Sequence, residues 1–268
     1  RFMAEDFAEK TAEVVQAAGF DVLLSESYAP TPAFSWAAKQ LNALGALVLT
    51  ASHNPANYLG LKVKGAFGGS VSPEVTQQIE AQLDSEPVAA QTPGSFQTFN
   101  PWPSYCDGLR SKVDMAQIQE LIAQEKLTVF VDVMHGAAAG GLSKLLLDAP
   151  IQEINSSRDP LFGGGAPEPL PRYLSQLFRV MRTHRRKQEG SLAVGLVFDG
   201  DSDRIAAVDG AGNFLSSQIL IPVLIEHLAE RRHYTGEVVK TISGSDLMPR
   251  VAALYQLPVY ETPIGYKY

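Results

Sequence analysis

Apolar and polar positions along this chain change repeatedly between the spacing of helices and that of strands. Short apolar runs are typical of buried strands, and apolar residues that recur every three or four positions predict amphipathic helices. The expected strands cover residues 21–24, 46–50, 127–131, 192–198, 205–208, 237–242 and 257–261. The expected helices cover residues 7–18, 32–44, 73–83, 138–147, 172–188, 217–231 and 246–256. This alternation favours an α/β fold with mostly parallel strand pairing.

Two of the expected helices begin with a proline that follows a hydroxyl residue. Thr31 precedes Pro32, and Ser72 precedes Pro73. Proline is favoured in the first turn of a helix, and a hydroxyl just before it can accept a hydrogen bond from a free backbone N–H. The sequence therefore predicts that Thr31 and Ser72 cap these two helices.

The alternation is interrupted once, between residues 85 and 103. This segment holds Gly94 and four prolines without sustained periodicity, which is typical of a linker. We therefore expect three units: residues 1–100, residues 101–211, and residues 212–268 as the incomplete start of a third. The abrupt beginning and end of the sequence suggest a chain truncated at both ends.

The composition argues against some classes of protein but does not select one function. With 268 residues, 45% of them hydrophobic, the chain can bury a sizeable core and is long enough for two domains. The net charge of −7 argues against a general nucleic-acid binder but leaves a local phosphate pocket open. The single cysteine, Cys106, excludes an internal disulfide and, without a signal-like N-terminus, predicts a cytoplasmic protein. No apolar run is long enough to cross a bilayer.

An acidic hexapeptide carries the clearest chemical signal. Asp199, Asp201 and Asp203 alternate within the sequence Asp-Gly-Asp-Ser-Asp-Arg, between the expected strands 192–198 and 205–208. Carboxylates crowded in this way repel one another unless they share a cation. Their place at strand ends is common for sites in α/β folds. A solvated acidic turn is the alternative that remains.

The carboxylate ligands limit which metal ions suit this site. Hard carboxylate oxygens favour Mg²⁺, Mn²⁺ or Ca²⁺ over zinc. An EF-hand is excluded, because Arg204 and Gly210 stand where that loop needs glycine and glutamate. An open carboxylate site at a sheet edge suits Mg²⁺ shared with a phosphate.

A second candidate segment, Thr-Ala-Ser-His-Asn-Pro, follows the strand expected at residues 46–50. Its Ser52 can act as a nucleophile or carry a phosphate, with His53 and Lys62 as a nearby proton carrier and cation. Taken singly, an ordinary turn serine, a hydrogen-bonded histidine and a solvated lysine explain them as well. The chain has no Gly-x-Ser-x-Gly elbow, no P-loop and no Gly-x-Gly-x-x-Gly after a strand.

Together, the segments at 50–55 and 199–204 resemble the signature of the α-D-phosphohexomutases, which include phosphoglucomutases and phosphomannomutases. The sequences at 158–163, 167–169 and 262–268 also resemble that family. The resemblance implies repeated α/β domains with mixed sheets around a central cleft. Of the family's four domains, this chain would contain most of the first, all of the second and the start of the third.

The family's site residues carry over to matching positions. Ser52 corresponds to the serine that carries the phosphoryl group. Asp199, Asp201 and Asp203 correspond to three Mg²⁺ ligands, with a phosphate oxygen on Ser52 as the fourth. Arg204 corresponds to the arginine beside them.

Further positions follow from the same resemblance. Lys62 corresponds to the candidate general acid/base and His53 to the neighbouring active-site histidine. Gly265 and Lys267 fall in a loop that would bind substrate. The chain departs from the common pattern at Leu59, where many members have asparagine, and at Ser202, where glycine or alanine is commoner.

The implied activity interconverts hexose 1-phosphate and hexose 6-phosphate through a phosphoserine and a bisphosphorylated sugar. Glucose is the expected sugar, with mannose or glucosamine phosphates as alternatives, and glucose 1,6-bisphosphate would act as activator and intermediate. The expected partners are small sugar phosphates, not nucleic acid or membrane; the oligomeric state is not predicted. Little turnover is expected from these residues alone, because the phosphate-binding fourth domain would be missing.

Two other classes of function are alternatives to a mutase. One is a non-catalytic module that binds Mg²⁺ and sugar phosphates. The other is a phosphatase with an aspartyl nucleophile, which is disfavoured because Asp203 stands where its Asp-x-Asp-x-Thr/Val pattern needs threonine or valine.

Overall fold

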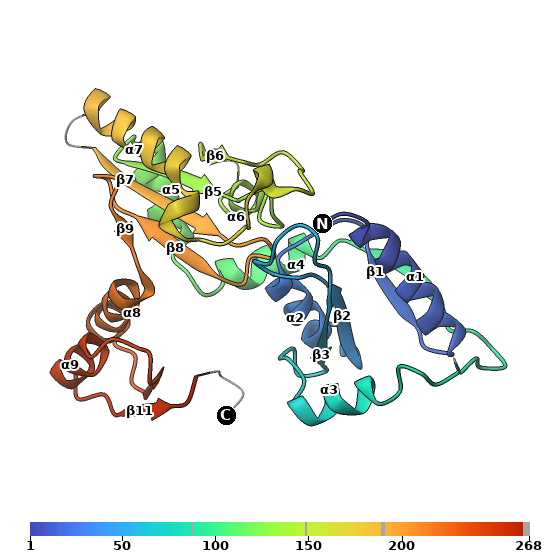
Figure 1. Ribbon diagram of the computed structural model, residues 1–268. Coiled ribbons are helices and arrows are strands. Elements are labelled where there is room, and N and C mark those ends of the chain that lie inside the picture. Colours follow the sequence, from blue (N-terminus) through green and yellow to red (C-terminus); the bar gives the residue numbers. More distant parts are fainter. Residues whose placement is uncertain (87, 148, 189–190, 265–268) are drawn as a thin grey trace.

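The computed structural model describes residues 1–86, 88–147, 149–188 and 191–264. Its elements form three groups along the chain (Figure 1). The first group contains α1 (Ala4–Ala17), β1 (Val22–Ser25), α2 (Thr31–Gln40), β2 (Gly45–Leu49), β3 (Leu61–Gly65), α3 (Pro73–Glu80) and β4 (Phe96–Phe99). Helix α1 ends where expected, just before Gly19, which adopts a φ of +91°.

The strands of the first group form two small sheets. β1 pairs with β4 in parallel, and β2 pairs with β3 in antiparallel register. Neither β3 nor β4 was expected from the sequence. The linker prediction for 85–103 is therefore wrong over Phe96–Phe99, where the chain returns to pair with β1. β3 places Lys62 directly opposite Val48, next to the loop that follows β2.

The middle group is built on the largest sheet of the described residues. Its helices are α4 (Trp102–Arg110), α5 (Met115–Ala123), α6 (Gly141–Leu145) and α7 (Ser175–Lys187). Its strands are β5 (Leu127–Asp132), β6 (Gln152–Ile154), β7 (Leu192–Phe198), β8 (Ile205–Val208) and β9 (Phe214–Leu215). The sheet order is β6-β5-β7-β8-β9, with β5 parallel to β6 and β7, and β8 antiparallel to β7 and β9.

Helices cover both faces of this sheet (Figure 1). Because side chains alternate along a strand, Phe130 packs on the face covered by Leu177 and Met181 of α7. Its neighbour Val129 points to the other face, where it packs with Ile122 of α5. Burial on both faces explains the nearly continuous apolar runs that predicted β5 and β7.

The third group contains α8 (Ser217–Glu226), β10 (Val238–Thr241), α9 (Leu247–Leu254) and β11 (Val259–Thr262). β10 and β11 pair in parallel, and a small core forms from Ile225, Met248 and Ala252. The single helix expected over 217–231 is instead an α-helix followed by a π-helical turn at His227–Arg231. The expected α/β architecture is confirmed, with parallel strand pairs in all three groups and a mixed sheet in the middle group.

The two capping predictions are wrong. Thr31 is the first residue of α2, and Ser72 stands at the N-cap position of α3, but neither helix has a side-chain cap within the described part of the chain. The Thr31 hydroxyl donates instead to Oδ2 of Asp201. Among the described helices, none has both the length and the apolar character needed to span a membrane.

Candidate active site

Two loops from different groups meet at the candidate site. The first connects β2 to β3 and is closed at its base by backbone hydrogen bonds from Thr50 N to Gly60 O (2.9 Å) and from Gly60 N to Thr50 O (3.1 Å). Within it Ser52 adopts a left-handed φ of +50°. Its backbone N–H donates to Oγ1 of Thr50 over 2.9 Å. This local bond holds Ser52 in a conformation that costs free energy for a residue other than glycine.

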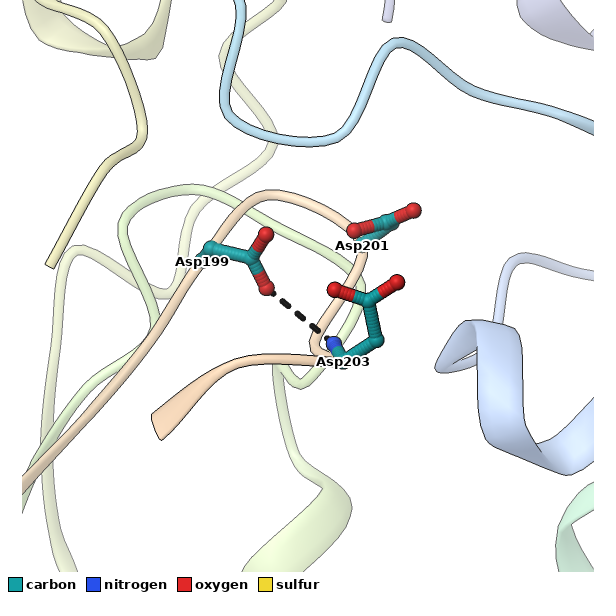
Figure 2. A group of neighbouring side chains, drawn as sticks. All are labelled: Asp199, Asp201 and Asp203. Atoms are coloured by element: carbon teal, nitrogen blue, oxygen red, sulfur yellow. Dashed lines mark hydrogen bonds between the residues drawn. The ribbon is translucent and has the colours of Figure 1, made fainter. Parts of the chain in front are cut away.

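The second loop is the acidic turn between β7 and β8, as the sequence predicted. Its fold is set by Asp199, whose Oδ1 accepts from the N–H groups of Asp203 and Arg204, each over 3.1 Å. Figure 2 shows the first of these bonds and the three carboxylates gathered around the turn. One carboxylate oxygen each from Asp199, Asp201 and Asp203 lies within 4.8 Å of the others.

The loop between β2 and β3, which carries Ser52 and is called the serine loop below, is in direct contact with the acidic turn. Ser52 Oγ donates to Oδ2 of Asp199 over 2.9 Å, and both residues are buried. Gly200 permits this approach, because a Cβ at that position would lie 2.6 Å from the carbonyl oxygen of Ser52 and 2.9 Å from Cγ of Pro167. The glycine of the motif is thus required by close packing of the two loops.

Asp201 is the most heavily engaged carboxylate. Its Oδ2 accepts from the hydroxyls of Thr31 and Thr50, each over 3.0 Å, and from Nζ of Lys62 over 2.7 Å. Its Oδ1 is buried and has no hydrogen-bond partner in the part of the chain that the structure describes. A buried carboxylate oxygen without a donor is costly unless a cation binds it.

Lys62 joins two of the three carboxylates. Its Nζ lies 2.7 Å from Oδ2 of Asp201 and 2.8 Å from Oδ2 of Asp203. Burial alone would lower the pKa of this lysine, but its hydrogen bonds to both carboxylates outweigh that effect and raise the pKa. Lys62 is therefore an ammonium at neutral pH.

The pKa values of two of these carboxylates, Asp199 and Asp201, are shifted in opposite directions. Burial, reinforced by the charge of Asp201, raises the pKa of Asp199 to about 6. Burial also acts to raise the pKa of Asp201, but the hydrogen bond and charge of Lys62 and the threonine hydroxyls lower it overall. The site thus holds one ionised carboxylate stabilised by the lysine and one whose ionisation is opposed by its surroundings.

These donors fit a divalent cation. Three carboxylates converge, one of their buried oxygens has no partner among the described residues, and two of the three are almost fully removed from water. Such a set suits a hard ion with oxygen ligands, whereas zinc prefers nitrogen and sulfur.

The remaining candidate residues are placed as follows. His53 lies beside Ser52, and its Nδ1 is buried without a partner among the described residues. The Arg204 side chain is half-exposed, with Nε 3.9 Å from Oδ1 of Asp203. Gly265 and Lys267 lie outside the described residues.

Two residues at this site were not identified from the sequence. The sequence predicts that Thr31 caps a helix, whereas in the structure its hydroxyl donates to Asp201. Arg1 donates to the carbonyl oxygen of Ser52 over 2.7 Å. Both line a cavity of about 630 Å³ that lies between the first and middle groups and reaches Asp201. No local pattern near either residue signals a contact with positions so distant in the chain.

Comparison with known families matches almost the whole chain. Family models for phosphoglucomutase/phosphomannomutase alpha/beta/alpha domains I, II and III match residues 1–89, 103–212 and 216–268. Human phosphoglucomutase-1 is 25% identical over 304 residues, covering 100% of this chain and 53% of that protein. Phosphoglucosamine mutase from Streptococcus uberis is 31% identical over 220 residues, covering 81% of this chain and 46% of that protein.

A solved structure gives the same result. A protein from Thermus thermophilus, provisionally described as a phosphomannomutase, is 30% identical with a TM-score of 0.87, covering 100% of this chain and 59% of that chain. This chain spans about half the length of the curated relatives that it matches. The names of these relatives differ in the sugar that they specify, so the similarity does not select one substrate.

Proposed function

This chain belongs to the phosphoglucomutase/phosphomannomutase family, and we propose on that basis that it provides the phosphoryl-transfer site of a hexose-phosphate mutase. The observation that carries the proposal is the contact between Ser52 Oγ and Asp199 within a cluster of three carboxylates. A serine hydroxyl held at such a cluster suits transient attachment of a phosphoryl group.

We propose Ser52 as the phosphoryl carrier. In the forward step the bond between phosphorus and Ser52 Oγ breaks, and a bond forms between phosphorus and a hydroxyl oxygen of a hexose monophosphate. This gives a hexose bisphosphate and free serine. Transfer of the other phosphate back to Ser52 completes the isomerisation. The hydroxyl that attacks gives up a proton in each step, and the oxygen that leaves takes one.

Lys62 and His53 are the candidates for handling these protons. Lys62 starts as an ammonium, so it can give a proton to a leaving oxygen or neutralise charge on the phosphoryl group. His53 Nδ1, unpartnered among the described residues, can accept one. Arg204 is proposed to lie beside the transferring group, and Gly265 and Lys267 remain predicted substrate contacts.

We propose Mg²⁺ as the cation, held by Asp199, Asp201 and Asp203 with a phosphate oxygen on Ser52. When bound, this ion would neutralise charge on the phosphoryl group during transfer. The buried Oδ1 of Asp201, which has no hydrogen-bond partner among the residues described, supports the assignment. Removal of Mg²⁺ by a chelator is expected to abolish phosphoryl transfer to Ser52.

For the substrate we propose glucose phosphates first and mannose or glucosamine phosphates as alternatives. Glucose 1,6-bisphosphate is the proposed activator and intermediate. The three predicted units, 1–100, 101–211 and 212–268, are proposed to act as successive domains of a longer mutase. A cytoplasmic location remains a prediction from the single cysteine.

Intact-mass spectrometry tests this function directly. The chain is incubated with Mg²⁺ and glucose 1,6-bisphosphate, and we expect one added phosphoryl group on the wild type and none on Ser52→Ala. Ser85→Ala, which changes an exposed serine whose hydroxyl donates to Gln82, is the matched control and is expected to gain the group. Equal labelling of Ser52→Ala and wild type, or no labelling of either, would refute the proposal.

The same phosphorylated protein tests the choice of sugar. It is mixed separately with the 1-phosphates of glucose, mannose and glucosamine, and loss of phosphate from Ser52 is followed over time. We expect the fastest loss with glucose 1-phosphate. Faster loss with another sugar would replace glucose by that sugar and leave the mutase proposal intact.

A further inference from the structure

The guanidinium of Arg1 lies inside the serine loop and binds its backbone. Nη2 donates to the carbonyl oxygens of Ser52 (2.7 Å) and Asn54 (2.8 Å). Nη1 donates to those of Pro55 (2.9 Å) and Tyr58 (3.0 Å). Carbonyls on both sides of the loop thus point towards one cation.

This arrangement uses the geometry particular to arginine. A guanidinium carries five N–H donors in a planar fork, and four donor contacts are made here to one loop. Hydrogen bonds from a charged donor are stronger than those between neutral groups. A lysine, with three donors on a single atom, cannot reach four carbonyls in this way.

Arg1 also connects the loop to the middle group. Its guanidinium carbon lies 4.9 Å from the centre of the Phe162 ring, a cation–π contact. A separate arginine, Arg158, donates from Nη2 to both carboxylate oxygens of Glu5, over 2.8 and 2.9 Å. Arg1 therefore links the backbone of the serine loop to Phe162 of the middle group.

The charge of Arg1 is retained in this environment. Burial lowers the pKa of its guanidinium, while the nearby carboxylates Asp201 and Asp199 act in the opposite direction. Arginine remains protonated in proteins at neutral pH. Its positive charge thus lies within the field of the same carboxylates that contact Ser52 and Lys62.

We propose that Arg1 is a positioning residue for phosphoryl transfer, which holds the 52–58 loop in the conformation that keeps Ser52 Oγ at Asp199. It touches the loop backbone and Phe162, not the hydroxyl that reacts. The transfer part of this inference rests on the proposed function, whereas the bracing of the loop does not. A displaced nucleophile would react more slowly, because phosphoryl transfer depends on alignment of the attacking and leaving oxygens.

Hydrogen exchange tests the bracing. The amides of Ser52, Asn54, Tyr58 and Gly60 are hydrogen-bonded within the loop or at its base, so their exchange reports loop opening. In Arg1→Ala we expect these amides to exchange at least about tenfold faster than in wild type. Arg1→Lys should fall between the two. Arg158→Ala, which removes the ion pair with Glu5 and keeps the Arg1 contacts, should match wild type.

The β7 amides at 192–198 serve as the internal control. Equal acceleration there would mean that Arg1 stabilises the whole chain rather than the loop, and would overturn the proposal. Unchanged loop exchange in Arg1→Ala would overturn it as well.

The rate of phosphoryl transfer to Ser52 from glucose 1,6-bisphosphate tests the catalytic consequence. We expect a fall of about 10- to 100-fold in Arg1→Ala, partial recovery in Arg1→Lys, and less than about a threefold change in Arg158→Ala. A wild-type rate in Arg1→Ala, despite faster loop exchange, would overturn the positioning role. If wild type itself takes no phosphate, the proposed function fails, and loop exchange alone still decides whether Arg1 braces the loop.

Discussion

The hydroxyl of Ser52 donates to Oδ2 of Asp199 over 2.9 Å, although the two residues are 147 positions apart. Asp199 is fully buried, and the charge of Asp201 adds to the cost of ionising it. The serine hydroxyl is one of the few groups that compensate for lost water at this carboxylate. The candidate nucleophile therefore contacts directly a carboxylate whose ionisation is opposed by burial.

The raised pKa of Asp199 predicts an unusual dependence of stability on pH. Its pKa in the folded protein is about 6, against an ordinary value of 3.8. Because the folded state binds the proton more tightly, this carboxyl favours folding below about pH 4 and loses that contribution as pH rises through about 6. Without metal, Asp199→Asn should therefore be more stable than wild type at pH 7.5, by on the order of 2 kcal/mol.

Urea unfolding in the presence of a chelator, from about pH 4 to pH 8, measures this difference. The advantage of Asp199→Asn should shrink as pH falls from 6 to 4. Saturating Mg²⁺ should reverse the order, because only wild type keeps the full set of carboxylates and bound metal stabilises the folded state. A wild type that is more stable than the variant at pH 7.5 without metal would contradict the raised pKa.

The contact between Lys62 and Asp201 predicts the opposite dependence of folding stability on pH. The lysine helps to lower the pKa of Asp201, so this carboxylate stabilises the folded state above its ordinary pKa and loses that contribution as pH falls through its folded pKa. In metal-free protein at pH 7, Lys62→Met should lower the free energy of unfolding by about 1–2 kcal/mol, since it leaves two carboxylates without their shared cation. The difference in unfolding free energy between Lys62→Met and wild type should become smaller at acidic pH.

Lys10→Met is the matched control, because Lys10 pairs with Glu13 on the exposed surface of α1. Its expected effect on unfolding is within about 0.5 kcal/mol at any pH. Similar losses in both variants would show that Lys62 acts as an ordinary surface lysine.

The sequence predicted the middle sheet well because its strands are buried on both faces. β7 and β8 lie where the apolar runs placed them, and the acidic turn lies between them. β3 and β4 were missed for a physical reason. β3, Leu61–Gly65, is short and carries two lysines, and β4, Phe96–Phe99, is mostly exposed among prolines. Their pairing depends on distant partners that local periodicity does not reveal.

The site could be predicted only as far as its chemistry was local. The spacing of three alternating aspartates singled out Asp199, Asp201 and Asp203 as candidate metal ligands, and their carboxylates converge in the fold. The partner Ser52 required a resemblance to a known family, because serine is common in turns. Thr31 and Arg1 act through contacts across the fold, and neither residue type signals such a contact.

Substitution of Thr31 tests whether its hydroxyl binds Asp201 or caps α2. If it serves Asp201 rather than α2, Thr31→Val should leave the helical circular dichroism unchanged while lowering stability by about 1 kcal/mol, because one donor to a buried carboxylate is lost. Thr31→Ser keeps the hydroxyl and should retain the bond. A loss of helical signal in Thr31→Val alone would instead support the capping role expected from the sequence.

Because Gly200 packs closely against Ser52, we predict that adding one methyl group at Gly200 pushes the two loops apart. In Gly200→Ala the new Cβ would lie 2.6 Å from the Ser52 carbonyl oxygen, which is backbone and cannot simply rotate away. We expect a loss of about 1–3 kcal/mol in stability from the forced shift. Phosphoryl transfer to Ser52 should fall by more than about tenfold, because the serine moves away from Asp199. Gly236→Ala is the control, since no heavy atom of the described residues other than its chain neighbours lies within 4 Å of its Cβ position, and it should change neither quantity. Wild-type transfer in Gly200→Ala would mean that the contact between the two loops is not needed for the reaction, so the serine and the carboxylates would then have to be brought together by some other part of the chain.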